Sequence, residues 1–243
     1  MKTQATNNRI RAIKNIGFVF ISLSLILSAC KKNDKALSID DEEAAEVMIA
    51  SVDPSTGGVI LNMETSNSIA VENASSLECG VVKDSTITKS GVSLNKSFNS
   101  TISWSRLLTC QNSVPQSFSF TFTGNSVFTS PRLTAQDTET GNLNVAGLQP
   151  STTQTTITGD FNREGNKESA VLKQRSFSSI LTGTCNVIID KKTQKIKSGQ
   201  INLNLQFESS SGTMLTKTGT LVFNGDNTAT LTLSSGTEYK ITW

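Results

Sequence analysis

Histidine is absent from the 243 residues, and aromatic side chains make up only 6% of them. Without histidine there is no Ser-His or Cys-His pair, and the commonest general base of enzymes is missing. The four cysteines form no Cys-x-x-Cys motif, so the usual zinc-binding spacing is missing too. We therefore predict no metal site, no cofactor and no catalytic residues, and a protein that is not an enzyme.

Carboxylates are the candidates that remain for acid–base catalysis. The alternative function is therefore a carboxylate-based polysaccharide hydrolase. Such an enzyme needs two carboxyl groups about 5–10 Å apart in a cleft, here beside exposed aromatic side chains, whereas a flat polar surface favours a binding protein. The acids before residue 161 in the predicted strand region belong to no recognisable motif: Glu64, Glu72, Glu78, Asp84, Asp137, Glu139 and Asp160.

The main apolar run, residues 16–27, is too short to cross a bilayer as a helix, which needs roughly 20 residues. Basic residues precede it and small residues follow it, which is the pattern of a secretory signal peptide. Leu27-Ser28-Ala29-Cys30 resembles the lipobox of bacterial lipoproteins, and an ordinary signal with a chance cysteine is the alternative. The resemblance implies that residues 1–29 are removed and that Cys30 carries acyl chains, two of which already give stable membrane anchoring.

Residues 30–37 are polar and read as a tether between the lipid and the folded domain. The leader takes four of the 22 basic residues with it, so the remaining chain is slightly acidic and nucleic acid is not an expected partner. Ser, Thr and Asn are abundant, as in β-rich exported proteins. We expect a lipid-anchored envelope protein with a binding or scaffolding role, held at the outer membrane on its periplasmic or surface face. Its partners would be the membrane and a glycan or another envelope protein.

A helix is predicted over residues 38–52, because Asp40 and Glu43 fit a capping box and Ala44, Val47 and Met48 follow helical spacing. Asp53-Pro54 and Gly57-Gly58 end it, and residues 57–243 read as a β domain. The predicted strands cover 59–63, 68–72, 77–82, 98–110, 117–123, 143–148, 154–161, 176–190, 195–208, 216–224, 228–234 and 237–243.

The last third of the chain has the clearest alternation, with five strands separated by short turn sequences such as Asn224-Gly225-Asp226-Asn227. This pattern predicts an antiparallel meander with one apolar face. The expected fold is all-β and antiparallel, a sandwich or flattened barrel with a C-terminal meander and one short N-terminal helix.

With Cys30 used as the anchor, three cysteines remain in an oxidising compartment. We predict a disulfide between Cys79 and Cys110, which both lie at strand margins, and a buried thiol at Cys185 within strand 176–190. The pairings 79–185 and 110–185 stay open.

Two further segments have a functional and a structural interpretation. Residues 160–165 have the opening spacing of a calcium loop, but Arg163 places a cation among the ligands and Val171 occupies the final ligand position, so a polar turn is predicted. Lys191, Lys192, Lys195 and Lys197 form the one basic cluster. We predict a charged hairpin tip there, with contact to anionic polysaccharide or lipid as the alternative.

Several segments after residue 77 resemble a group of exported lipoproteins of unknown function from Gram-negative bacteria. The resemblance implies the location and the β architecture, and it supplies no catalytic residue. It rests on Glu78-Cys79-Gly80-Val81 with Asp84-Ser85-Thr86, on Trp104, Cys110-Gln111-Asn112 and Pro115, and on the closing segment 219–233.

Overall fold

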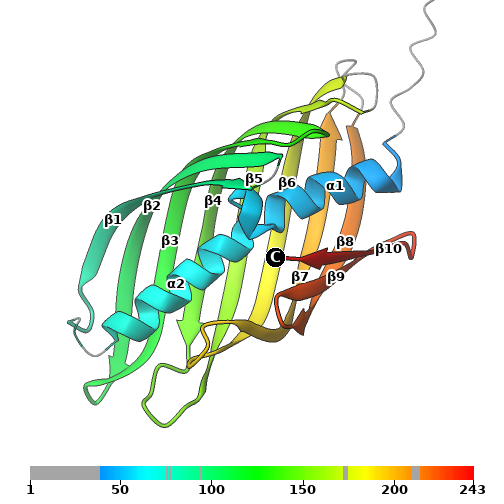
Figure 1. Ribbon diagram of the computed structural model, residues 1–243. Coiled ribbons are helices and arrows are strands. Elements are labelled where there is room, and N and C mark those ends of the chain that lie inside the picture. The colour runs from blue at the N-terminus through cyan, green and yellow to red at the C-terminus, as the bar shows by residue number, and fades with distance from the viewer. Residues whose placement is uncertain (1–38, 75, 77, 94, 172–174, 209–213) are drawn as a thin grey trace, which may run out of the picture. The chain divides into compact units, whose positions relative to one another are not determined.

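One antiparallel sheet dominates the computed structural model (Figure 1), which describes residues 39–243 except 75, 77, 94, 172–174 and 209–213. The described residues belong to a unit that starts at Ala36. The strands are β1 (Val82–Ser93), β2 (Lys96–Gln111), β3 (Val114–Thr129), β4 (Leu133–Ala146), β5 (Gln154–Ser169), β6 (Arg175–Asp190), β7 (Ile196–Glu208), β8 (Met214–Gly225), β9 (Thr228–Leu233) and β10 (Glu238–Thr242).

Every strand pairs with its neighbour in sequence, so the order across the sheet is β1 to β10 and each connection is a hairpin. The sheet is open, with β1 and β10 as its two edges. This confirms the all-β, antiparallel prediction with a flattened sheet. The meander predicted for the last third extends across all ten strands, and helices form the second layer.

Two helices cover the face of the sheet that we call the inner face (Figure 1). Helix α1 (Asp41–Val52) packs on β7 and β9, and α2 (Val59–Asn73) packs on β4 and β5. Inward side chains alternate along the strands, as in β7, where Ile201, Leu203, Leu205 and Phe207 are all buried. Burying these apolar side chains between sheet and helices is the main driving force of the fold.

The predicted N-terminal helix is confirmed as α1. The Asp40 carboxylate accepts a hydrogen bond from the Glu43 backbone N–H at 2.8 Å, and Ala44, Val47 and Met48 are buried. Asp53 then caps a short 3-10 helix, η1 (Pro54–Thr56), and Gly57 follows with φ +71°, a left-handed conformation that glycine adopts without strain.

The predicted strands 59–63 and 68–72 are wrong, because these residues form α2. The buried positions Ile60, Met63, Asn67 and Ala70 recur at helical spacing. Polar residues occupy part of this inward stripe, so its apolar members do not show the period by themselves. The β domain assigned to residues 57–243 therefore begins with a helix.

The polar turn predicted at residues 160–165 is also wrong. These residues lie in the middle of β5, which runs to Ser169 and pairs with β4 and β6 along its length. Arg163 points to the inner face and is buried, as is Lys167. Charged side chains at core positions break the apolar alternation, so the strand reads as a turn in sequence. The predicted strand 77–82 is misplaced as well, since β1 begins at Val82.

Candidate binding surface

The outer face of the sheet, opposite the helices, is made of hydroxyl and amide side chains. We define it as the outward residues of β2 to β9, which alternate with the buried ones. On β3 they include Ser119, Thr121, Thr123 and Asn125, and β9 presents Thr228, Thr230 and Thr232. This face is solvent-exposed, as expected for an antiparallel sheet with one packed side.

Neighbouring strands exchange side-chain hydrogen bonds across the outer face. The Thr121 hydroxyl donates to the Asn142 amide oxygen at 3.1 Å, and the Asn224 amide nitrogen donates to the Thr230 hydroxyl at 3.0 Å. Such cross-strand pairs stabilise the sheet and fix the orientation of the polar groups. The face therefore presents an ordered array of donors and acceptors.

Two shallow depressions interrupt this face. The larger, about 660 Å³, lies over β3 to β6, and its outward lining includes Asn125, Gln136, Glu164, Asn166 and Ser178. The second, about 370 Å³, lies over β5 to β7 beside Gly183. Both have sizes that occur among ligand sites, and most of the residues that line them carry hydroxyl, amide or carboxyl groups.

Charge on the outer face is mainly negative. Asp160, Glu164 and Glu168 point outward from β5, and Glu208 does so at the end of β7. Among the outward side chains of β2 to β9 that the structure describes, Lys197 is the one cation, in the irregular start of β7. A mainly negative field disfavours acidic ligands and favours neutral or cationic ones.

Aromatic platforms are missing from the exposed surface within the described residues. The large apolar side chains exposed there are aliphatic and include Val127 and Ile180 beside the larger depression. The aromatic rings instead pack inside, for example Trp104 edge-on against Phe120 with ring centroids 5.4 Å apart. A ligand on the outer face would thus be held by hydrogen bonds and small aliphatic contacts.

The inner face holds a buried ionic cluster between β4, β5 and the helix connection. The Arg163 Nε donates to an Asp137 oxygen at 2.7 Å, and the Lys167 ammonium donates to the other Asp137 oxygen. Arg163 also donates through Nη1 to the backbone oxygens of Ser51, at the end of α1, and Gly57. The cluster therefore fastens the turn between the helices to the sheet.

A second polar contact joins α2 to the sheet. The Asn62 amide donates to one oxygen of Glu139 at 3.2 Å, and the Ser100 hydroxyl donates to the other at 3.3 Å. Burial raises the pKa of Glu139, and the charge of Arg163 opposes that rise. Burial likewise lowers the pKa of Lys167, which Asp137 counteracts. Glu139 thus holds α2 directly, and Lys167 and Asp137 support Arg163, which holds the connection between the helices.

The acids considered for a hydrolase are dispersed over the molecule. Asp137 and Glu139 are buried and paired, while Asp160 points outward with Glu164 as its nearest acid along the strand. Four strand residues span roughly 13 Å between Cα atoms, more than the 5–9.5 Å between the carboxyl groups of glycosidases. Within the part of the chain that the structure describes, no group of three or more potential ligands gathers as a metal site.

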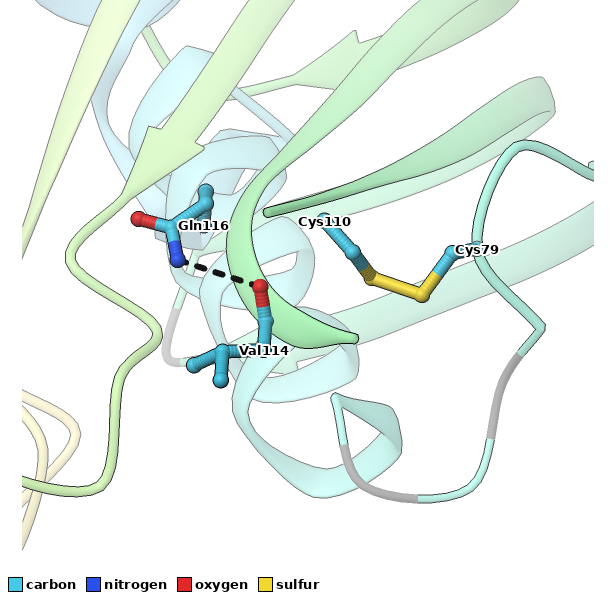
Figure 2. The surroundings of a disulfide bond; sticks show 4 residues. All are labelled: Cys79, Cys110, Val114 and Gln116. Atoms are coloured by element: carbon cyan, nitrogen blue, oxygen red, sulfur yellow. Dashed lines mark hydrogen bonds between the residues drawn. A yellow bond between two sulfur atoms is a disulfide. The ribbon is translucent and has the colours of Figure 1, made fainter. Parts of the chain in front are cut away.

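The predicted disulfide is present, between Cys79 and Cys110 with Cα atoms 5.7 Å apart (Figure 2). It ties the segment before β1 to the end of β2, where the Gly80 N–H also donates to the Leu108 oxygen at 2.8 Å. Cys185 is a free, buried cysteine, as predicted. Burial, and then the charge of Asp160, raises the pKa of this thiol to about 12, so it stays protonated and unreactive.

The lysine cluster lies at the β6–β7 hairpin, as predicted, and acids accompany it. The Lys191 ammonium donates to the Gln149 backbone oxygen at 2.8 Å. Lys195 and Lys197 share a depression with Asp190 and Asp226. The two acids offset part of the charge of the four lysines, and the hairpin tip keeps a net positive charge.

Cys30, the predicted lipidation site, lies outside the described residues, as does the tether of residues 30–37. No helix among the described residues has the length and apolar character needed to span a membrane. Comparison with protein-family models, with curated proteins and with solved structures found no match. The functional interpretation accordingly depends on the residues and geometry described above.

Proposed function

We propose that the protein is a lipid-anchored protein of the bacterial cell envelope that binds a neutral or amino-bearing glycan chain on the outer face of its sheet. The observation that carries this proposal is the outer face itself, an exposed array of hydroxyls and amides with two shallow depressions and acids on β5. Glycans present many hydroxyl groups, and a surface of ordered donors and acceptors can pair with them at many points.

The shallow depressions and the lack of exposed aromatic anchors among the described residues argue for weak binding at any single site. A lipid anchor compensates for this weakness, because many copies held on one membrane meet the same polymer together. Such multivalency raises apparent affinity by roughly 10²–10⁴ without a new contact. Anchoring and a shallow polar surface thus form one consistent binding strategy.

The test of the binding function is retention of polysaccharides by the protein displayed on liposomes. Neutral glucans and chitosan should be retained, and alginate, an acidic chain, should not. Asn166→Arg, in the larger depression, should abolish retention of chitosan, whereas Asn224→Arg on β8 is the matched control outside both depressions. Preferential binding of alginate, or equal loss in both variants, would contradict the proposal.

The anchor has its own test. Cys30→Ala should release the protein from membranes or block its processing, because the acylated thiol is lost. A variant that stays in the membrane fraction with the mass of the mature protein would remove the anchor from the proposal and leave glycan binding to be judged separately.

A further inference from the structure

A groove of about 560 Å³ runs along α1, between the helix and residues of β2, β3, the β3–β4 turn and β10. Its floor is mainly apolar, formed by Ala45, Ile49 and Ala50 of α1, Phe128 at the end of β3, and the ring of Tyr239 on β10. Ile49, Ala50 and Tyr239 are partly exposed. The volume lies within the range of small-molecule sites, roughly 300–1,000 Å³.

Ion pairs close the rim of this groove. Arg132, in the β3–β4 turn, binds Glu42 at 2.9 Å and Glu46 at 3.2 Å, and Lys96 binds Asp53 at 3.5 Å. With three acids and two cations, the lining carries a small net negative charge. Burial, and then the charges of Asp41 and Glu42, raise the pKa of Tyr239, which reflects the same negative field.

The chain itself indicates what reaches this groove. The described residues start at Ile39, immediately before α1, and residues 31–38 separate it from Cys30. Eight residues reach at most roughly 30 Å when fully extended. If the proposed anchor holds, Ile39 stays within that reach of the bilayer surface, and the groove begins at Glu42 on the first turn of α1. Alkyl chains are the most abundant apolar ligands near a bilayer.

We propose that the groove beside α1 binds the alkyl chain of a zwitterionic or uncharged amphiphile, with the head group at the ion-paired rim. The floor would hold the chain by burial of methylene groups. Arg132 and Lys96 would face the anionic part of a zwitterionic head, and Glu42, whose side chain is 69% exposed, would face its cationic part. A purely anionic head is disfavoured by the net charge of the lining. The proposed source of this amphiphile is the bilayer that holds the anchor.

The experiment uses the mature chain carrying Cys30→Ala, so that its outcome does not depend on the anchor. Tyr239 is the chain's single tyrosine, so labelled tyrosine gives one set of ring signals in nuclear magnetic resonance. Dodecylphosphocholine, added below its critical micelle concentration, should shift these signals saturably. The decyl homologue should bind about tenfold more weakly, because each buried methylene contributes about 0.8 kcal/mol. Dodecanoate should bind more weakly than dodecylphosphocholine.

Two isoleucines provide a matched pair of variants. Ile49 and Ile69 are both partly buried helical residues that pack on the core, but only Ile49 lines the groove. Ile49→Gln should weaken binding about tenfold, and Ile69→Gln should leave it unchanged. Ala50→Phe, which fills the groove without adding a polar group, should also block binding. It keeps the proposal testable if Ile49→Gln fails to fold.

Further measurements identify the source of the bound chain and test whether another molecule occupies the groove. The full lipidated protein in phosphatidylcholine nanodiscs should show the bound Tyr239 signals without added ligand, because the bilayer supplies the chain. Bound signals that appear only after addition of an amphiphile would overturn the bilayer as the source. Tyr239 signals that do not respond, affinities independent of chain length, or equal effects of the two isoleucine variants would overturn the proposal. A dimer whose formation alone moves the Tyr239 signals would overturn it too, since the groove would then hold a second copy.

Discussion

The two halves of the sheet hold the helices in different ways. In β1 to β5 the inner face contains buried Glu139 and Arg163, which hydrogen-bond to α2 and to the connection between the helices. Buried Ser100, Ser126 and Asp137 hold these two side chains in place. In β6 to β10 the inner face is almost entirely apolar within the described residues, with Ser179 as its one buried polar side chain. A partly exposed ion pair at 2.7 Å between Lys217 of β8 and Asp41 joins this half to α1. Attachment in the first half thus uses buried polar contacts, and in the second half it depends mainly on close packing of apolar groups.

This difference indicates which contacts set the position of the helices on the sheet and which contacts only add stability. Apolar packing tolerates a change of shape at similar volume, whereas a buried charge that loses its partner is costly. The position of the α1–α2 connection on the sheet is therefore determined by Arg163, which reaches Ser51 and Gly57. The meander of the second half supplies most of the apolar core beside α1.

The contrast is tested by placing methionine at one inner position in each half. Arg163→Met should lower the free energy of unfolding by about 3 kcal/mol, the lower end for a broken buried pair, because Lys167 still compensates Asp137. Leu205→Met on β7 should cost less than about 1.5 kcal/mol. Urea unfolding of both variants measures the difference, and equal costs would remove the contrast between the halves.

The disulfide is the covalent part of the first half. Replacing Cys79 and Cys110 together by alanine should cost about 3.7 kcal/mol in the chain-entropy model, since the sequence separation is 31 residues. Cys185→Ala is the control without a crosslink, although it also removes a small buried side chain. Thermal unfolding measures this loss. Adding reductant to the wild type should lower its melting temperature by the same amount as the double substitution does. A melting temperature that stays unchanged in both cases would show that this disulfide does not stabilise the fold.

A smaller effect should appear as a pH dependence. Because the pKa of folded Glu139 lies above 4.5, the folded chain binds more protons than the unfolded chain between these values. The free energy of unfolding contributed by Glu139 therefore falls as the pH rises through that window, by about 1.4 kcal/mol for each unit by which its pKa is raised. Glu139→Gln cannot titrate and should become more stable relative to the wild type from pH 4.5 upward. A constant difference would show that this carboxyl is not perturbed.

The same contrast explains what could be predicted from the sequence. The meander was predictable because Ile201, Leu203, Leu205 and Phe207 alternate with polar residues and the turns between strands carry Asn, Gly and Asp. Helix α1 was predictable from its cap and its spacing. The pairing of Cys79 with Cys110 followed from the placement of both cysteines at strand margins.

The first half was harder because its inward side chains are polar. Arg163 and Lys167 look like turn or surface residues, and only their long-range partner Asp137 makes them core residues. Asn62 and Asn67 likewise hide the helical stripe of α2, since their partners Glu139 and Thr155 lie far away in sequence. The outer face could be expected as the polar side of the strands, but its depressions depend on the pairing of four strands.

The central claim is that the inner face is committed to the helices and the outer face is free to bind. Backbone amide shifts during titration with a chitosan oligosaccharide test it most directly, using the mature chain with Cys30→Ala. We predict saturable shifts along the central residues of β3 to β6, around Asn125, Gln136, Asn166 and Ser178, with the amides of α1 and α2 unchanged. Shifts confined to the helices or to the lysine hairpin of β6 and β7 would contradict the account.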